Sequence, residues 1–206
     1  MFPRGPKACQ FTCWRLGERH DLKLSSIILG VCPMNEIKFY GVPAGWLPAP
    51  RRKPMTTPQF NVVLYQPEIP QNTGNIGRTC VALNAKLWIV RPTGFRLDDK
   101  QLQRAGLDYW QHLDWESVDS WIHLLPKLPM ERTWFFTKFA SRSYSDATFQ
   151  QGDWLVFGSE SSGLPDSVRE QFGSQCLSLP MIGPVRSLNL SVAVGVGLFE
   201  AYRQTV

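Results

Sequence analysis

The stretch LVFGSESSGLP at residues 155–165 decides the fold, because it joins an apolar run to a polar, glycine-rich loop. Two more stretches have the same form: PEIPQNTGNIGR at residues 67–78 and LPMIGPVRSLN at residues 179–189. Each polar loop follows a short apolar run that reads as a buried strand. In a parallel α/β sheet, loops at the carboxyl ends of the strands gather at one edge and form the site. The sequence therefore predicts that these three loops lie together.

Strand and helix patterns alternate along residues 60–203. We expect strands at residues 60–65, 86–90, 133–137, 153–158 and 176–180. We expect a first helix that begins within the loop after the first strand and runs to about residue 83. Further helices are expected at residues 98–104, 117–125, 166–172 and 189–203. Asn72, Thr73 and Asn75 are candidates for capping the first of these helices. This alternation is typical of a Rossmann-like α/β fold with a largely parallel sheet.

The last expected helix, from Asn189 to Arg203, is apolar nearly all round. A helix with one face in water would carry polar residues on that face. We therefore expect it to be buried on two sides, either inside the monomer or at an interface between subunits.

The composition indicates a globular protein with no membrane span. The chain has 206 residues, of which 43% are hydrophobic and 19% charged. No apolar run approaches the roughly 18 residues that a membrane-spanning helix needs. The five cysteines form no CxxC pair, and their odd number disfavours a disulfide framework, so we expect a reducing, cytoplasmic location. The three histidines are scattered and show no zinc-ligand spacing, so we expect no metal.

Positive charge is concentrated in the first quarter of the chain. Residues 1–54 hold nine Lys and Arg against three acids, whereas residues 55–206 hold 13 basic and 14 acidic residues. The first segment also lacks a sustained strand or helix period. We expect residues 1–54 to be a disordered extension or an artefact of the assigned start, and residues 55–206 to form one domain that starts at Met55.

The three polar stretches, in this order and spacing, resemble the motifs of the SPOUT class of RNA methyltransferases. They are most similar to the small TrmL/YibK-like subfamily, which methylates the ribose 2′-hydroxyl of the wobble nucleotide (cytidine or modified uridine) in tRNA anticodons. The resemblance covers about residues 60–204. It implies S-adenosylmethionine (AdoMet) as methyl donor, a deep C-terminal trefoil knot, tRNA as partner, and a homodimer packed through the last helix.

The resemblance also implies roles for individual residues. For cofactor binding these are Phe136, Gly158, Leu179, Met181, Ser187 and Leu188. For catalysis they are Arg78, Ser187 and Asn189. For binding the RNA substrate they are Asn72, Asn75, Arg78, Glu160 and Arg186.

Arg78 is the family's candidate catalytic residue, but a guanidinium stays protonated at accessible pH and is a poor base. We therefore expect Arg78 to clamp an RNA phosphate through two hydrogen bonds, the alternative being a structural Arg at a helix start. RNA contact requires a local basic patch. Residues 78–104 carry a net charge of +4 and residues 108–131 a net of −4. We expect the first segment to face the tRNA, with Lys138, Arg142 and Arg186 nearby; a merely solvated helix face is the alternative.

Two other functions remain open at this point. The first is a SPOUT methyltransferase that acts on another tRNA position or on ribosomal RNA. The second is a non-catalytic RNA-binding protein that keeps the knot without turnover.

Overall fold

The computed structural model describes residues 57–97 and 109–206, so the expected 1–54 extension and the expected helix at 98–104 lie outside the described residues. Six strands form one sheet in the order β3-β2-β1-β5-β4-β6, and every strand pairing in it is parallel. The strands are β1 (Asn61–Tyr65), β2 (Lys86–Val90), β3 (Trp115–Val118), β4 (Thr133–Phe136), β5 (Trp154–Phe157) and β6 (Cys176–Leu177). The predicted parallel α/β fold is confirmed.

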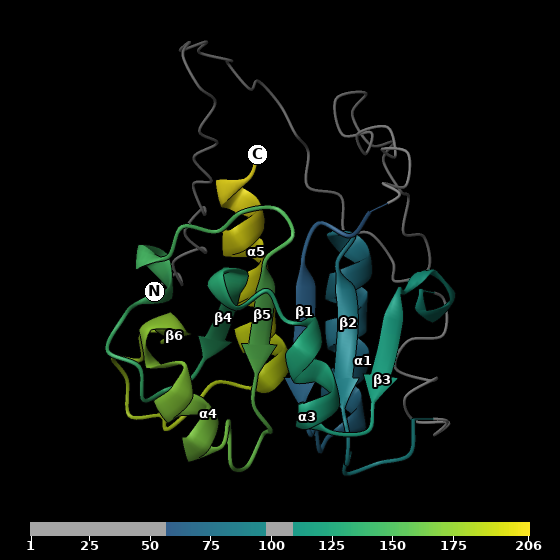
Figure 1. Cartoon of the computed structure of the whole chain (residues 1–206), viewed down its shortest axis with the longest axis horizontal. Coiled ribbons are helices and arrows are strands. Elements are labelled where there is room, and N and C mark those ends of the chain that lie inside the picture. The colour runs from purple at the N-terminus through teal and green to yellow at the C-terminus, as the bar shows by residue number, and fades with distance from the viewer. Residues whose placement is uncertain (1–56, 98–108) are drawn as a thin grey trace, which may run out of the picture. The chain divides into compact units, whose positions relative to one another are not determined.

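Helices cover both faces of this sheet (Figure 1). The long helices α1 (Pro70–Ala82) and α5 (Leu190–Gln204) pack on one face. The short helices α3 (Trp121–Leu124) and α4 (Asp166–Gln171) pack on the other. Side chains of a strand alternate between the two faces of the sheet, so each central strand contributes side chains to a hydrophobic core on either face.

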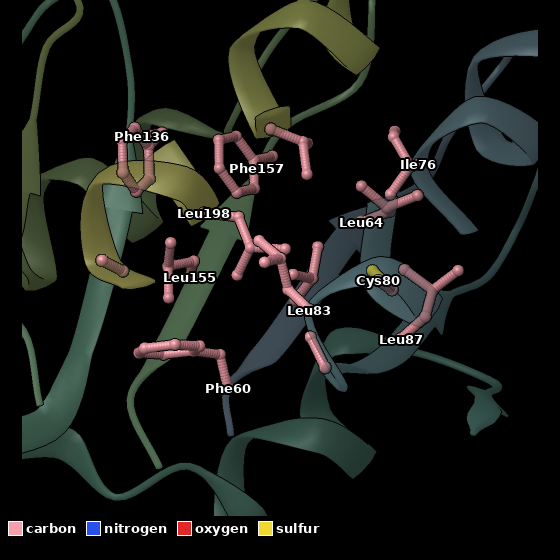
Figure 2. Close-up of a cluster of buried hydrophobic side chains, with 14 of the residues drawn as sticks. Phe60, Leu64, Ile76, Cys80, Leu83, Leu87, Phe136, Leu155, Phe157 and Leu198 are labelled. Carbon is pink, nitrogen blue, oxygen red and sulfur yellow. The ribbon is translucent and has the colours of Figure 1, made fainter. Parts of the chain in front are cut away.

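The larger core lies between the sheet and the two long helices (Figure 2). Leu64 of β1 and Leu155 of β5 meet Ile76 of α1 and Leu198 of α5 there, and all four are fully buried. Val63, one residue earlier on β1, belongs to the opposite core with Leu124 of α3. Because the centre of the sheet is buried on both faces, its strands are almost continuously apolar.

The order in which successive strands are added to the sheet reverses beside β1. The strands β1, β2 and β3 follow one another outward, whereas β5, β4 and β6 lie on the other side of β1. Such a switch point opens a crevice at the carboxyl ends of the neighbouring strands, which is where α/β proteins bind ligands.

Two predicted elements and the predicted caps of the first helix are wrong. The helix expected at 117–125 is divided into the edge strand β3 and the shorter helix α3, since residues 115–118 pair with β2. Only Val118 of β3 is buried, so the apolar pattern of a strand is weak there. Helix α1 begins at Pro70, a favoured first helical residue, so Asn72, Thr73 and Asn75 lie inside the helix and do not cap it. Strand β6 ends at Leu177, because the chain beyond it turns toward the cavity described below.

Helix α5 is buried on one side only within this chain. Val194, Leu198 and Ala201 are fully buried, whereas Val192, Val196 and Phe199 are 50%, 38% and 54% exposed. The exposed residues recur at spacings of three and four and so form one stripe along the helix. Among residues 57–97 and 109–206, no segment buries this second side of the helix. Among residues 57–97 and 109–206, no helix is long and apolar enough to span a membrane.

Candidate functional site

A cavity of about 380 Å³ opens at the carboxyl ends of β4 and β5. All three polar loops contribute to its wall, as their positions after strands predict. Residues Ile69 and Asn72 come from the first loop, residues 158–164 from the second, and Leu179, Met181 and residues 187–189 from the third. The end of β4 and the first turns of α5 complete the wall.

Two stacked phenyl rings form part of the apolar wall. Phe136 ends β4 and Phe157 ends the neighbouring β5, and their ring centroids are 4.5 Å apart with an interplanar angle of 15°. Gly197 of α5 lies against both rings, and a Cβ added there would come within 2.8 Å of Phe136 Cζ. The glycine therefore lets α5 pack closely on the rings that line the cavity.

Gly158 is required by a close approach of the chain to itself. A Cβ at this position would lie 2.1 Å from the carbonyl carbon of Gly163 and 2.3 Å from the backbone nitrogen of Leu164. Ser159 and Gly163 exchange both backbone hydrogen bonds, at 3.2 and 3.0 Å, and so close a tight turn. Gly163 has a φ of +72°, which L side chains rarely adopt. The loop is thus folded back against the end of β5.

A chain of hydrogen bonds joins the three loops. Asn189 Nδ2 donates to Asn72 Oδ1 at 2.9 Å, and Asn72 Nδ2 donates to Glu160 Oε1 at 3.0 Å. Asn72 is 5% exposed, so its amide exchanges few contacts with water. These hydrogen bonds join residues that are 88 and 117 positions apart in the sequence, and so fix the three loops relative to one another at the cavity wall.

Glu160 and Asn189, at the two ends of this series of hydrogen bonds, also bind backbone N–H groups at the starts of α1 and α5. Glu160 accepts the backbone N–H groups of Glu68 at 2.8 Å and of Ile69 at 3.3 Å, just before α1. A carboxylate at a helix N-terminus is stabilised by the helix dipole and satisfies N–H groups that the helix cannot. Asn189 Oδ1 accepts the backbone N–H of Ser191 at 2.9 Å and the Ser191 hydroxyl at 2.6 Å, which caps α5. Glu160, Asn72 and Asn189 are hereafter called the junction.

Most of the residues picked from the sequence line this cavity. They are Asn72, Phe136, Gly158, Glu160, Leu179, Met181, Ser187, Leu188 and Asn189. The other three, Asn75, Arg78 and Arg186, are exposed and lie outside the wall. The Arg78 guanidinium carbon lies 4.7 Å from the centroid of the Tyr109 ring, and the Tyr109 hydroxyl donates to Gly74 O at 2.7 Å.

Part of the wall was not predicted from the sequence. Phe157 and residues 137–139 lie at the carboxyl ends of β5 and β4, and Ser159, Ser161 and Ser162 lie in the second loop. The rule that strand ends form the site would have picked out the residues that follow β4, since they occupy the same edge of the sheet as Gly158.

The expected basic face is partly neutralised. Lys86 of β2 contacts Glu116 of β3 at 3.2 Å and Asp114 at 3.8 Å, and Arg91 contacts Asp119 at 3.7 Å. The basic and acidic segments therefore pair with each other, because they contribute adjacent parallel strands. Lysine contacts lower the pKa of the Glu116 carboxyl, first through the hydrogen bond from Lys127. Lys86 and Arg91 are thus paired with acids of the neighbouring segment, and Lys100 and Arg104 lie outside the described residues, so RNA contact by residues 78–104 stays a prediction.

Cysteine and metal chemistry find no support in the described part of the chain. Cys80 and Cys176 are free and buried, and burial raises the pKa of both thiols. A buried neutral thiol is a poor nucleophile. Within residues 57–97 and 109–206, no three His, Cys, Asp or Glu side chains are grouped so that they could hold a metal ion.

A parallel α/β sheet with a cavity at the carboxyl ends of its strands, lined by three glycine-containing loops, is typical of the class of enzymes that bind a small molecule. Residues 59–199 match the SpoU rRNA Methylase family. The chain belongs to this family, and the resemblance to SPOUT methyltransferases is confirmed.

The chain covers nearly the whole length of two relatives and about three fifths of a third, more distant one. The tRNA (cytidine(34)-2′-O)-methyltransferase of Methylovorus glucosotrophus is 46% identical over 146 residues, which are 70% of this chain and 95% of the relative. A solved structure presented as structural insights into the 2-OH methylation of C/U34 on tRNA is 51% identical, with a TM-score of 0.68 over 70% of this chain and 95% of that chain. The SpoU methyltransferase AviRb of Streptomyces viridochromogenes, in complex with AdoMet, is 25% identical, with a TM-score of 0.62 over 73% of this chain and 60% of that chain.

Proposed function

We propose that this chain transfers a methyl group from AdoMet to the ribose 2′-hydroxyl of the wobble nucleotide, cytidine or modified uridine, in tRNA anticodons. The observation that carries the proposal is the joining of all three polar loops around one cavity in a chain that matches tRNA (cytidine(34)-2′-O)-methyltransferases over nearly their full length. The proposed substrate and the free Cys80 and Cys176 support a reducing, cytoplasmic location.

The cavity fits AdoMet in size and chemistry. Small-molecule sites typically measure about 300–1,000 Å³ and combine apolar walls with a few polar groups. Here Leu179, Met181 and Leu188 supply apolar side chains, and Ser187 supplies a hydroxyl. The close approach at Gly158 leaves backbone rather than side chain at the end of β5. When bound, AdoMet supplies a methyl group on a sulfonium, which is already activated for transfer.

The remaining task of the protein is to orient the ribose and to let its hydroxyl proton leave. The junction serves the first purpose, because Glu160, Asn72 and Asn189 keep the three loops in one geometry. Asn189 uses both its amide nitrogen and its oxygen in this role, so we assign it to positioning and keep Ser187 as the polar group nearest to reacting atoms. Arg78 stays charged and clamps an RNA phosphate, and the proton leaves through phosphate or water. Asn75 and Arg186, both exposed, are assigned to RNA contact.

We further propose a homodimer that packs through α5. The exposed stripe of Val192, Val196 and Phe199 supports it, since three apolar side chains on one helix face otherwise remain in water. Phe199→Arg is expected to give a monomer by sedimentation, with the circular dichroism of the parent chain.

We also propose the trefoil knot between β6 and α5. In its support, β6 forms the edge of the sheet, whereas α5 packs centrally against α1 and β5.

The test is methyl transfer from labelled AdoMet to unmodified tRNA from a strain that lacks its own wobble methyltransferase. Nuclease digestion and mass spectrometry then locate the product. A 2′-O-methyl group on the wobble nucleotide, lost in Arg78→Ala, supports the proposal. Product at another nucleotide or in ribosomal RNA supports the wider SPOUT assignment instead, and tight AdoMet binding without transfer supports an RNA-binding role. Turnover by Arg78→Lys at the parent rate would refute the clamp, because Lys keeps the charge but loses the two-pronged hydrogen bonding.

A further inference from the structure

An exposed phenyl ring stands at the mouth of the cavity. Phe139 lies in the turn that follows β4, contributes to the cavity wall, and is 64% exposed. Most phenylalanines are buried, because a phenyl group in water forfeits the free energy of burial. An exposed ring beside a substrate cavity therefore marks a surface that a partner covers.

The turn that carries the ring is tied to the sheet. Thr137 Oγ1 accepts the backbone N–H of Phe139, and Thr137 O accepts that of Ala140, both at 3.4 Å. Ala140 packs against the core on the α3 and α4 side. The Thr137 N–H in turn donates to Leu177 O of β6 at 2.9 Å, so the backbone that carries the ring is tied to the sheet beside Phe136, which also lines the cavity.

Two cations lie close to the ring. The Arg169 guanidinium carbon lies 4.3 Å and the Lys138 Nζ 5.2 Å from the ring centroid, both within the range of cation–π attraction. Arg169 is fixed by an ion pair with Asp166 and by a hydrogen bond of 3.4 Å from its Nε to Leu164 O. Lys138 is exposed and lines the cavity mouth. The surface therefore joins an aromatic face to positive charge, which a nucleic acid complements with its bases and phosphates.

We infer that a nucleobase of the tRNA, beside the ribose to be methylated, stacks on Phe139 while Lys138 binds an adjoining phosphate. This inference rests on the proposed function and adds an RNA-positioning residue to it. Unpaired loop bases are commonly recognised by stacking on aromatic side chains, and stacking tolerates any base. A purely apolar protein partner fits the site less well, because it would bury the Lys138 ammonium without giving it a charge partner.

The test compares Phe139→Leu with Phe139→Trp in the full chain. Leu keeps apolar volume but removes the π face, whereas Trp keeps it. Stacking on one side chain contributes about 1–3 kcal/mol, so Phe139→Leu is expected to raise the KM for tRNA by roughly five- to 150-fold. Phe139→Trp is expected to keep the parent KM, and the Kd for AdoMet is expected to stay the same in both. Ile122→Ala is the matched control, because Ile122 is 76% exposed on α3 and does not line the cavity.

Stacking itself has a direct readout. Anticodon stem-loop RNAs that carry 2-aminopurine at one loop position each are expected to lose fluorescence at a single position on binding, and to keep it with Phe139→Leu. Tighter binding at low salt reports phosphate contacts, because each contact steepens the dependence of log affinity on log salt concentration. Lys138→Gln is expected to reduce the magnitude of that slope by about 1, the contribution of one phosphate contact.

The outcomes separate this inference from the function beneath it. No methyl transfer to any tRNA by the parent chain overturns the proposed function and the stacking with it. Parent activity with an unchanged tRNA KM in Phe139→Leu overturns the stacking alone. An equal loss of AdoMet affinity also overturns it, because the ring would then serve the cofactor. Capture of a protein at this surface, with tRNA binding unaffected, overturns it in favour of a protein partner.

Discussion

Strand β5 carries a carboxylate just outside each of its ends, and the two carboxylates sit in opposite environments. Asp153, before the strand, is 1% exposed and accepts hydrogen bonds from Arg132, Trp134 and the backbone of Gln150. Glu160, after the strand, is partly exposed and borders the cavity. Both carboxylates tie distant segments together, but only Glu160 does so next to a ligand-sized space.

The difference separates stability from function along one strand. Arg132 reaches Asp153 through Nε at 2.7 Å and Nη2 at 2.5 Å, and Trp134 Nε1 adds a third bond at 2.8 Å. A buried carboxylate that is satisfied in this way holds the fold, and its burial keeps it away from a substrate. The hydrogen bonds of Glu160 are 2.8–3.3 Å long and lie closer to solvent, as expected where loops must accept a ligand and an RNA.

The largest effect is expected from Gly158→Ala at the functional end. The added methyl would lie 2.1 Å from the Gly163 backbone, so the loop must move. Overpacking costs about 1–3 kcal/mol, and here the shift also displaces Glu160 and the cavity wall. We expect loss of AdoMet binding by calorimetry and a fall of about 3 kcal/mol in the free energy of unfolding in urea. Gly152→Ala, at the other end of β5, has no atom within 4 Å of the added Cβ but has a φ of +92°, so it reports backbone strain alone. Equal AdoMet binding by both variants would contradict the argument.

Asp153→Asn tests the stabilising end. The variant leaves Arg132 without its charge partner and turns an amide N–H₂ group toward donors. Removing one partner of a buried ion pair costs about 3–5 kcal/mol, and we expect about 3 because Arg132 is partly exposed. The activity of the molecules that remain folded is expected to equal that of the parent chain. A lower kcat in fully folded protein would show that this end also serves the reaction.

Glu160→Gln reverses that pattern. The amide keeps the shape and one acceptor but cannot accept hydrogen bonds at both oxygens, so the contacts to Glu68 N–H and Asn72 cannot both persist. A loss of one hydrogen bond costs about 1 kcal/mol of stability. Misplacement of the junction is expected to lower kcat/KM by about 100-fold, because positioning errors of about 1 Å have effects of that size. A loss of stability as large as that of Asp153→Asn, with kcat/KM unchanged, would make Glu160 a structural residue like Asp153.

The same two ends show what the sequence could and could not predict. The strand DWLVFG and its glycine-rich loop were recognisable, because apolar runs and glycines are local signals. The partners of Asp153 and Glu160 were not, because Arg132 and Asn72 are distant in sequence and meet only through the sheet order. The start of α1 was misassigned for a related reason, since its N-cap Ile69 has no side-chain cap and its backbone N–H is instead bound by Glu160, 91 residues away. Phe139 was missed because no local pattern distinguishes an exposed phenyl ring from a buried one.

A third carboxylate, Glu200 on α5, gives the smallest expected effect. The hydrogen bond from Arg203 lowers the pKa of Glu200 to about 2, and Gln204 donates to it as well. Because the folded-state pKa lies below the ordinary value of 4.5, the stabilisation is present above about pH 4.5 and is lost as pH falls toward 2. Surface pairs of this kind contribute about 0.2–1 kcal/mol. Glu200→Gln is therefore expected to be less stable than the parent chain by about 0.5 kcal/mol at pH 6 in urea unfolding, with the difference shrinking as pH falls below 4.5. A difference that stayed constant down to pH 3 would assign the effect to packing of Gln204 rather than to the charge of Glu200.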